Sequence, residues 1–151
     1  CSSDLESDFV SFDMQRGIDL EPSAIGYLAD LLSEEFIGVS KVGFCEYNEH
    51  IGSSLDALMT NNSCGESKCP NAVNFFKLKI KDEVDETHVN QCHHHMLCSD
   101  TDRCYYINYL EHKNVQYHYL KIIERDNAKI KMMLERYEMV IDLKLKYIDK
   151  L

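Results

Sequence analysis

The segment "CYYINYLEHKNVQYHY", residues 104–119, decides how the last third of the chain is interpreted. It lies within residues 71–151, which contain neither glycine nor proline, and such a region favours uninterrupted elements. Ser99 is a suitable N-cap ahead of it, and Asp100 and Asp102 would lie in a first helical turn, where the helix dipole favours negative charge. We therefore predict that residues 99–151 are helical.

Apolar side chains in this third recur at alternating steps of three and four residues, as in an amphipathic helix. One solution is a single long helix that self-associates as a coiled coil. The other is an antiparallel hairpin that turns at "RDNA", residues 125–128, where Asn127 can adopt the left-handed conformation. Both solutions predict a helical bundle and an oligomer or protein partner. The predicted interface residues are Tyr105, Tyr109, Ile130, Leu134, Tyr137, Ile141 and Ile148.

Residues 1–60 are predicted to form an acidic helical subdomain. Ser3 and Glu6 form a capping box for a first helix, which Gly17 can end. A second helix begins at Pro22 and places apolar side chains on one face. These side chains are Ile25, Leu28, Leu32, Phe36 and Val39. A third, short helix is expected to begin at Ser53 or Ser54.

Residues 61–98 are predicted to form a strand and a loop module rich in cysteine and histidine. The stretch "FFKLKIK", residues 75–81, alternates apolar residues with lysines, which is typical of a half-buried strand. With helices before and after this module, the predicted fold class is mainly α.

The stretch "CHHHMLCSDTDRC", residues 92–104, contains three cysteines and three consecutive histidines. Zinc is usually held by four nitrogen or sulfur ligands in two close pairs. Cys64 and Cys69 offer one pair, and His95 and Cys98 offer the other, so we predict a structural zinc site there. The reserve ligands are Cys92, His93, His94 and Cys104.

Disulfides are the main alternative to zinc, because the chain has seven cysteines and Asn61-Asn62-Ser63 is an N-glycosylation sequon. An odd number of cysteines and their neighbouring histidines weigh against disulfides. A third interpretation is that the cysteines are free and the histidines solvated. The start at Cys1 suits either a processed, lipid-anchored protein or the edge of a longer sequence.

The net charge of −10 is concentrated at one end of the chain. Residues 1–62 hold twelve acidic and two basic side chains and so carry the whole imbalance, and this acidic part would repel phosphate backbones. We therefore expect no nucleic acid to bind through it. No apolar run approaches the roughly 18 residues of a membrane span. An intracellular location is favoured, or a secreted one if the cysteines are disulfide-bonded.

No motif names a reaction: HExxH, GxSxG, the P-loop and GxGxxG do not occur in the sequence. The predicted function is a non-enzymatic protein–protein interaction or assembly factor with a structural zinc. The first alternative is a secreted or surface-exposed, disulfide-stabilised helical binding protein. The second is a small zinc- or cysteine-dependent enzyme.

Overall fold

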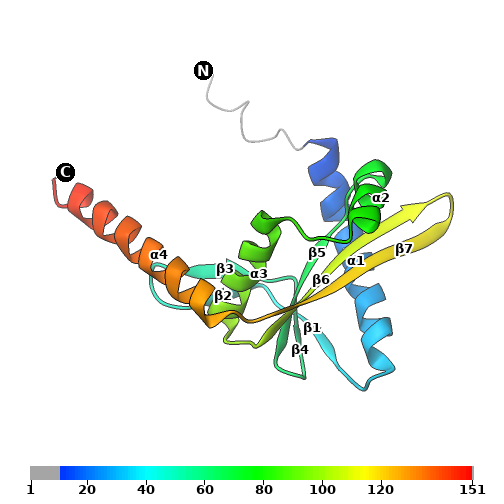
Figure 1. Ribbon diagram of the computed structural model, residues 1–151, viewed down its shortest axis with the longest axis horizontal. Helices are drawn as coiled ribbons and strands as arrows, with labels where there is room; N and C mark the ends of the chain where they lie inside the picture. The colour runs from blue at the N-terminus through cyan, green and yellow to red at the C-terminus, as the bar shows by residue number, and fades with distance from the viewer. Residues whose placement is uncertain (1–10, 151) are drawn as a thin grey trace.

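The computed structural model describes residues 11–150, and their fold is mixed α/β rather than the predicted mainly α (Figure 1). A five-stranded sheet has the strand order β1-β4-β5-β6-β7, and β2 and β3 pair as a separate two-stranded sheet. The strands are β1 (Val39–Lys41), β2 (Phe44–Glu46), β3 (Gly52–Ser54), β4 (Ala57–Met59), β5 (Ser63–Lys68), β6 (Arg103–His112) and β7 (Val115–Glu124). The helices are α1 (Phe12–Ser33), α2 (Ala72–Lys81), α3 (Glu86–Ser99) and α4 (Asn127–Ile148).

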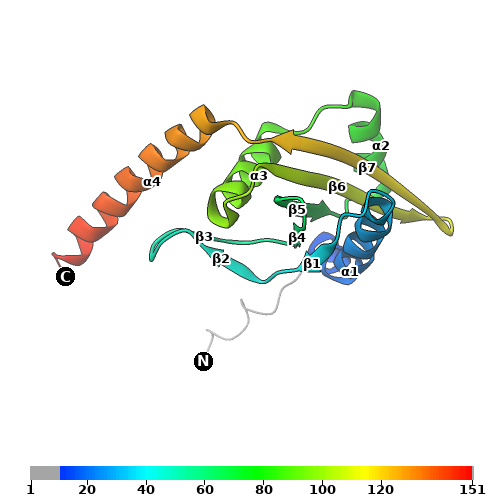
Figure 2. The same cartoon turned by 90° about the horizontal axis from the view of Figure 1, so that it is seen from below.

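The five-stranded sheet is the central layer, with α1 on one face and α2 and α3 on the other (Figure 2). Its strands come from all three of the predicted units, 1–60, 61–98 and 99–151. β5 and β6 pair in parallel, and the other neighbours in this sheet pair antiparallel. α2 and α3 form the crossover that a parallel pair requires.

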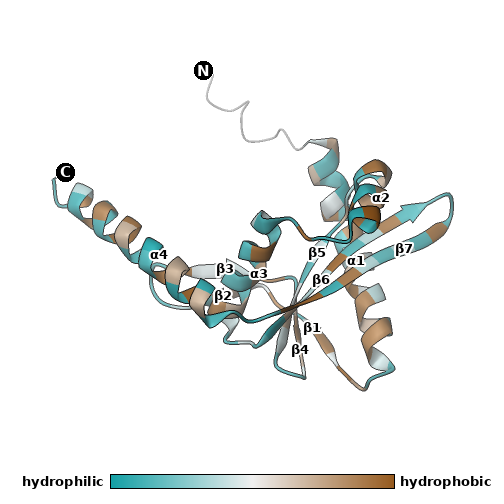
Figure 3. Ribbon diagram, viewed as in Figure 1, coloured by the Kyte–Doolittle hydropathy of each residue, from teal (hydrophilic) through white to brown (hydrophobic). Residues whose placement is uncertain are grey.

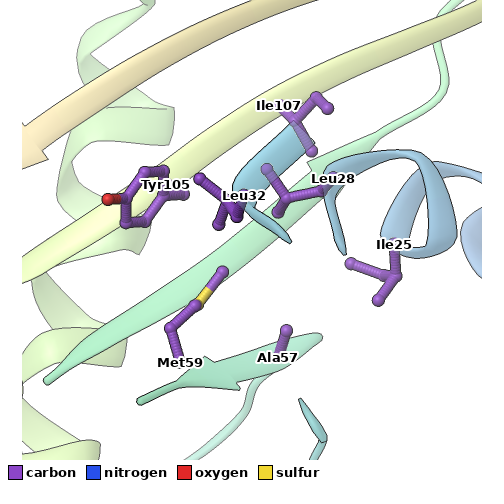
Figure 4. Packing of buried hydrophobic residues seen from close by; sticks show 7 residues of the cluster. All are labelled: Ile25, Leu28, Leu32, Ala57, Met59, Tyr105 and Ile107. Atoms are coloured by element: carbon purple, nitrogen blue, oxygen red, sulfur yellow. The ribbon is translucent and has the colours of Figure 1, made fainter. Parts of the chain in front are cut away.

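The core between α1 and the sheet is apolar (Figure 4). α1 contributes Ile25, Leu28 and Leu32, as the predicted apolar face required. They pack against side chains of β4 and β6, including Ile107, which is fully buried. Burying a side chain of this size stabilises a fold by roughly 1.5–3 kcal/mol, so this layer holds α1 firmly against the sheet.

The opposite face of the sheet carries the cysteine-rich part of the core. Cys64 of β5, Cys92 of α3 and Cys104 of β6 are fully buried there with Met96 and Tyr106. A separate cluster beneath α2 is centred on Phe75, Leu110 and Tyr119.

The segment that was predicted to continue a helix is a β-hairpin. β6 and β7 pair over ten residues each, and a two-residue loop, Lys113-Asn114, joins them. The φ angles of these two residues are 51° and 62°, and positive φ at both positions is the signature of a type I′ turn. β6 is covered on both faces, so Cys104–Leu110 are all buried and show no strand alternation. That is why the helical prediction for this segment is wrong.

Two other secondary-structure predictions are also wrong. The stretch 75–81 lies in α2, where Asn71 caps the start and Asp82 ends the helix in the left-handed conformation. Ser99 ends α3 instead of capping a helix, and Asp100 is the C-cap. Local capping therefore overrides the alternating pattern of residues 75–81.

The N-terminal third also differs from the prediction. α1 continues through Gly17 and Pro22, and residues 39–59 form strands rather than the end of one helix and a third helix. The capping box at Ser3 and Glu6 lies outside the described residues. None of the helices in the described part of the chain is long and apolar enough to cross a membrane.

α4 is a single helix that projects from the body of the fold (Figure 3). Asp126 caps its start, so "RDNA" marks a strand-to-helix junction and not the turn of a helical hairpin. The described residues form neither a coiled coil nor a helical bundle, which corrects those predictions. Of the predicted interface residues on this helix, Ile130 is buried and Ile148 is exposed. The Tyr137 hydroxyl forms a hydrogen bond with His94 Nδ1.

Candidate active site

Acidic and basic side chains lie close together at the C-terminal end of β5. Glu66 and Lys68 are two residues apart on this strand, so their side chains project from the same face. Lys68 Nζ lies 2.9 Å from Glu66 Oε1. Glu66 is only 5% exposed, whereas the Lys68 side chain is 30% exposed, so the pair lies between the core and the surface.

Asp56 reaches the same place from the connection between β3 and β4. Its Oδ2 accepts hydrogen bonds from the backbone N–H of Ser67, at 2.7 Å, and from the Ser67 hydroxyl, at 3.0 Å. Asp56 directly precedes the registered pair Ala57–Gly65 of β4 and β5, which brings its position opposite Glu66. The sheet therefore sets two carboxylates and one ammonium group together.

The two carboxyl groups have different electrostatic environments. Burial and the nearby charge of Glu66 raise the pKa of Asp56 from 3.8 to about 6. Burial also raises the pKa of Glu66, but the hydrogen bond from His95 and the charges of His95 and Lys68 outweigh it and lower this pKa overall. Glu66 is thus held ionised, and its negative charge makes ionisation of Asp56 less favourable.

His95 fixes the orientation of Glu66 from α3. Its Nε2 lies 2.7 Å from Glu66 Oε2, and its Nδ1 lies 2.5 Å from the hydroxyl of Ser53. His95 is 3% exposed, so this chain of hydrogen bonds is sealed from solvent. Buried polar groups of this kind restrict a side chain to one rotamer.

The two carboxylates and Lys68 line a cleft of about 780 Å³. α1 forms one wall and contributes Glu21, whose charge also raises the pKa of Asp56. α2 and the segment that leads to α3 form the opposite wall. The cleft is large enough for a substrate to reach the carboxylates from outside.

This donor set suits a hard divalent cation. Mg²⁺ and Mn²⁺ prefer carboxylate oxygens, and a cation there would relieve the repulsion that raises the pKa of Asp56. Within residues 11–150 no group of three or more His, Cys, Asp or Glu side chains is placed to hold a metal. Mg²⁺ does not need such a group, because it usually binds one or two carboxylates and completes its shell with water and substrate phosphate.

The four predicted zinc ligands do not come together. Cys64 and Cys69 are five residues apart along an extended segment, about 16 Å at 3.3 Å per residue, whereas zinc–sulfur bonds are about 2.3 Å long. His95 is bonded to Glu66 and Ser53. Cys98 lies 3.8 Å from His94. Within residues 11–150, these four side chains are therefore not placed as a tetrahedral zinc site.

The three consecutive histidines each have a separate structural partner. His93 donates to the Val89 carbonyl through Nδ1, and its Nε2 accepts from the N–H of Asp126. His94 donates to the Gly52 carbonyl through Nε2 at 2.8 Å. The reserve ligands Cys92 and Cys104 are buried in the core, and the six described cysteines are free thiols.

Two of the predicted interface tyrosines belong to the core. Tyr105 packs in the α1 cluster. Tyr109 is fully buried, and its hydroxyl donates to Glu111 Oε1 at 2.7 Å. Neither ring is available to a partner.

Two carboxylates and a lysine thus line one cleft, and a buried histidine fixes one of the carboxylates from behind. The profile of the YqaJ-like viral recombinase domain matches residues 2–102, which include all of these side chains. The chain belongs to this family.

Solved structures share the fold. The alkaline exonuclease LHK-Exo from Laribacter hongkongensis superposes with a TM-score of 0.76 and 23% identity, covering 94% of this chain and 75% of that one. The same exonuclease in complex with dAMP gives 0.76 and 22%, covering 95% and 75%. A phage-related exonuclease from Haemophilus somnus gives 0.73 and 18%, also covering 95% and 75%. A comparison with curated proteins found no match.

Family membership overturns the functional predictions made from the sequence. A recombinase domain is not a non-enzymatic assembly factor, and the six described cysteines are free thiols, which contradicts a disulfide-stabilised binding protein. Recombinases act on DNA, so the exclusion of nucleic acid on the basis of the acidic N-terminal part is also wrong. The net charge was a poor guide to the substrate, because substrate binding depends on a few side chains in a cleft and not on the charge of the whole chain.

One pattern in the sequence does point to this site. "ESK", residues 66–68, has an acid and a base at alternate positions, and Asp56 lies ten residues before Glu66. A three-residue motif occurs often by chance. Its meaning depends on the strand that presents both side chains to one face.

Proposed function

We propose that the protein is a DNA exonuclease that depends on a divalent metal ion. The observation that carries this proposal is the meeting of Asp56, Glu66 and Lys68 at the base of the cleft. The exonuclease names of the structures with this fold, and the recombinase family, support DNA as the substrate.

Hydrolysis of a phosphodiester requires water to attack phosphorus, with the breakage of one P–O bond and release of a hydroxyl group. Asp56 and Glu66 would hold a divalent cation, which supplies Lewis-acid charge and lowers the pKa of a bound water. Lys68 presents an ammonium group in the cleft, where it can bind an anionic phosphate and donate a hydrogen bond to the attacking water.

The neighbouring groups keep this arrangement ready for the substrate. Ser67 holds the Asp56 carboxylate with two hydrogen bonds. His95 holds one oxygen of Glu66, and Lys68 contacts the other. Because these contacts exist without substrate, little reorganisation is needed when DNA enters the cleft.

The direct test is digestion of labelled linear duplex DNA in the presence of Mg²⁺, with covalently closed circular DNA alongside. We expect the linear DNA to be degraded and the circle to persist, and a chelator should stop degradation. Asp56→Asn, Glu66→Gln and Lys68→Met should each lower the rate by at least about 100-fold, because electrostatic groups at a reacting phosphate contribute on that scale.

Matched controls are the exposed residues Asp142 and Lys131 of α4. Asp142→Asn and Lys131→Met should retain the rate of the unmodified protein. Cleavage by Asp56→Asn at the unmodified rate would refute the proposed site. Rapid cleavage of the closed circle would refute an exonuclease.

A further inference from the structure

α2 forms a basic wall of the cleft. Asn74, Lys77 and Lys81 all line the cleft, and their spacing of three and four residues places them on one helical face. α2 contains three lysines and no acidic residue, in a chain whose net charge is −10. The positive charge is therefore concentrated on this side of the site.

The opposite wall, on α1, is unsuited to an anionic substrate. Its residues Asp13 and Glu21 line the cleft. The one cation among its cleft-lining residues, Arg16, is already engaged: Nη2 lies 2.8 Å from Asp13 Oδ1, and Nε donates to the Cys69 carbonyl at 3.1 Å. A phosphate backbone that enters the cleft should follow α2 and avoid α1.

The two cleft-lining lysines of α2 are available for binding. Both are exposed, and within residues 11–150 Lys77 takes part in no ion pair. Lys81 Nζ lies 3.9 Å from Glu83 Oε2, but both side chains are about two-thirds exposed, at 68% and 73%. An ion pair this exposed contributes little, so it leaves Lys81 free to bind phosphate.

Lys79 lies between them but points elsewhere. Its Nζ lies 3.5 Å from the His118 carbonyl and 5.9 Å from the centroid of the Phe75 ring, and it does not line the cleft. The same helix thus carries a lysine of equal charge and similar exposure that faces away from the site.

We propose that Lys77 and Lys81 bind successive phosphates of the DNA strand that enters the cleft and so align it on Asp56 and Glu66. This inference rests on the proposed nuclease function. The two lysines are about 6 Å apart along the helix axis, and their flexible side chains can reach adjacent phosphates. α2 starts four residues after Lys68, so the row of lysines continues directly from the site.

The test measures DNA binding separately from cleavage. All variants are made in the Asp56→Asn background with a chelator present, so that a short fluorescent linear duplex stays intact. Affinity is measured by fluorescence anisotropy at several salt concentrations. Loss of two phosphate contacts in Lys77→Ala/Lys81→Ala should reduce the slope of log K against log salt by about 1.4–1.8.

Lys79→Ala is the control of equal charge and should leave the slope unchanged, while Lys77→Arg/Lys81→Arg should restore it. In the otherwise unmodified enzyme, Lys77→Ala/Lys81→Ala should raise KM and leave kcat unchanged, because these contacts bind substrate and transition state equally. Equal slopes for the double variant and Lys79→Ala would overturn the proposal, even if the enzyme cleaves DNA. Absence of DNA binding by every variant, the parent included, would overturn it together with the proposed function.

Discussion

His95 Nε2 lies 2.7 Å from Glu66 Oε2, and this contact links the histidine-rich helix α3 to the strand that carries the candidate site. The histidine is sealed from solvent and is oriented on its other side by Ser53. Its role is to position Glu66, because Glu66, rather than His95, lines the cleft.

We expect His95→Ala to raise the Mg²⁺ concentration needed for half-maximal cleavage by about 10–100-fold, the usual effect of losing a group that orients a metal ligand. A Mg²⁺ titration of the cleavage rate measures this. His95→Gln should recover part of the affinity, because its amide N–H can still donate to Glu66. The exposed His50 provides the control His50→Ala. An unchanged Mg²⁺ requirement in His95→Ala would contradict the positioning role.

Asp56 should make the metal-free protein less stable at neutral pH than in mild acid. Its pKa is about 6 in the folded protein against an ordinary value of 3.8, so protonation favours folding. This stability is fully present below about pH 4 and is lost as the pH rises through about 6. Asp56→Asn should remove this pH dependence and stabilise the apo-protein at pH 7 by on the order of 1 kcal/mol, after allowance for solvent screening. Chemical denaturation at pH 4, 5, 6 and 7 measures it, and a variant less stable at pH 7 would contradict the prediction.

Mg²⁺ should stabilise the protein in a manner that depends on the same carboxylate. Above pH 6 Asp56 is ionised and can bind the cation, whereas below pH 6 the cation must displace a proton. We expect Mg²⁺ to raise the melting temperature at pH 7.5 and to have little effect at pH 5. Asp56→Asn and Glu66→Gln should lose the shift, while Asp142→Asn should keep it. An equal shift in all variants would place the bound cation elsewhere.

Substitutions in the turn between β6 and β7 should increase the stability of the protein. Lys113 and Asn114 have φ angles of 51° and 62°, and a left-handed conformation costs an ordinary side chain roughly 1 kcal/mol. Replacing Lys113-Asn114 by Asn-Gly, the preferred pair for a type I′ turn, should stabilise the protein by about 1 kcal/mol. Thermal unfolding checks this. A fall in melting temperature would show that the loop is not constrained as its φ angles indicate.

Local patterns in the sequence identified some elements and missed those that depend on tertiary context. Ile25, Leu28 and Leu32 face the core because a single amphipathic helix covers one side of a sheet. β6 could not be identified in the same way. Helices cover both of its faces, so its residues are buried on both sides and lack the alternation that marks a strand.

The α2 segment shows the reverse problem. Its lysines and apolar residues alternate, but its ends carry helix signals, with Asn71 as N-cap and Asp82 in a left-handed C-cap. The capping residues were the better guide, because they satisfy backbone groups that a strand would have paired with a neighbour.

The candidate site depended on strand pairing that no local pattern reveals. Asp56 and Glu66 are ten residues apart in the chain, and the antiparallel register of β4 and β5 brings them opposite each other. The prominent histidines and cysteines drew attention to zinc instead. Of the four predicted zinc ligands, His95 bonds to the carboxylate of Glu66, and Cys69 lines the same cleft.

The parallel pairing of β5 with β6 also governs when the site can form as the chain is synthesised. Lys68 lies opposite Asn108, so the strand that carries Glu66 and Lys68 lacks its neighbour until 40 further residues have been made. At about 5–20 residues per second this interval is roughly 2–8 seconds. During it the edge of β5 is unpaired, and α1 lacks its packing against Tyr105 and Ile107 of β6. A nascent chain halted before β6 therefore holds all the candidate site's side chains but lacks the strand that completes the sheet beside them, and chaperones would have their main opportunity to bind at this stage.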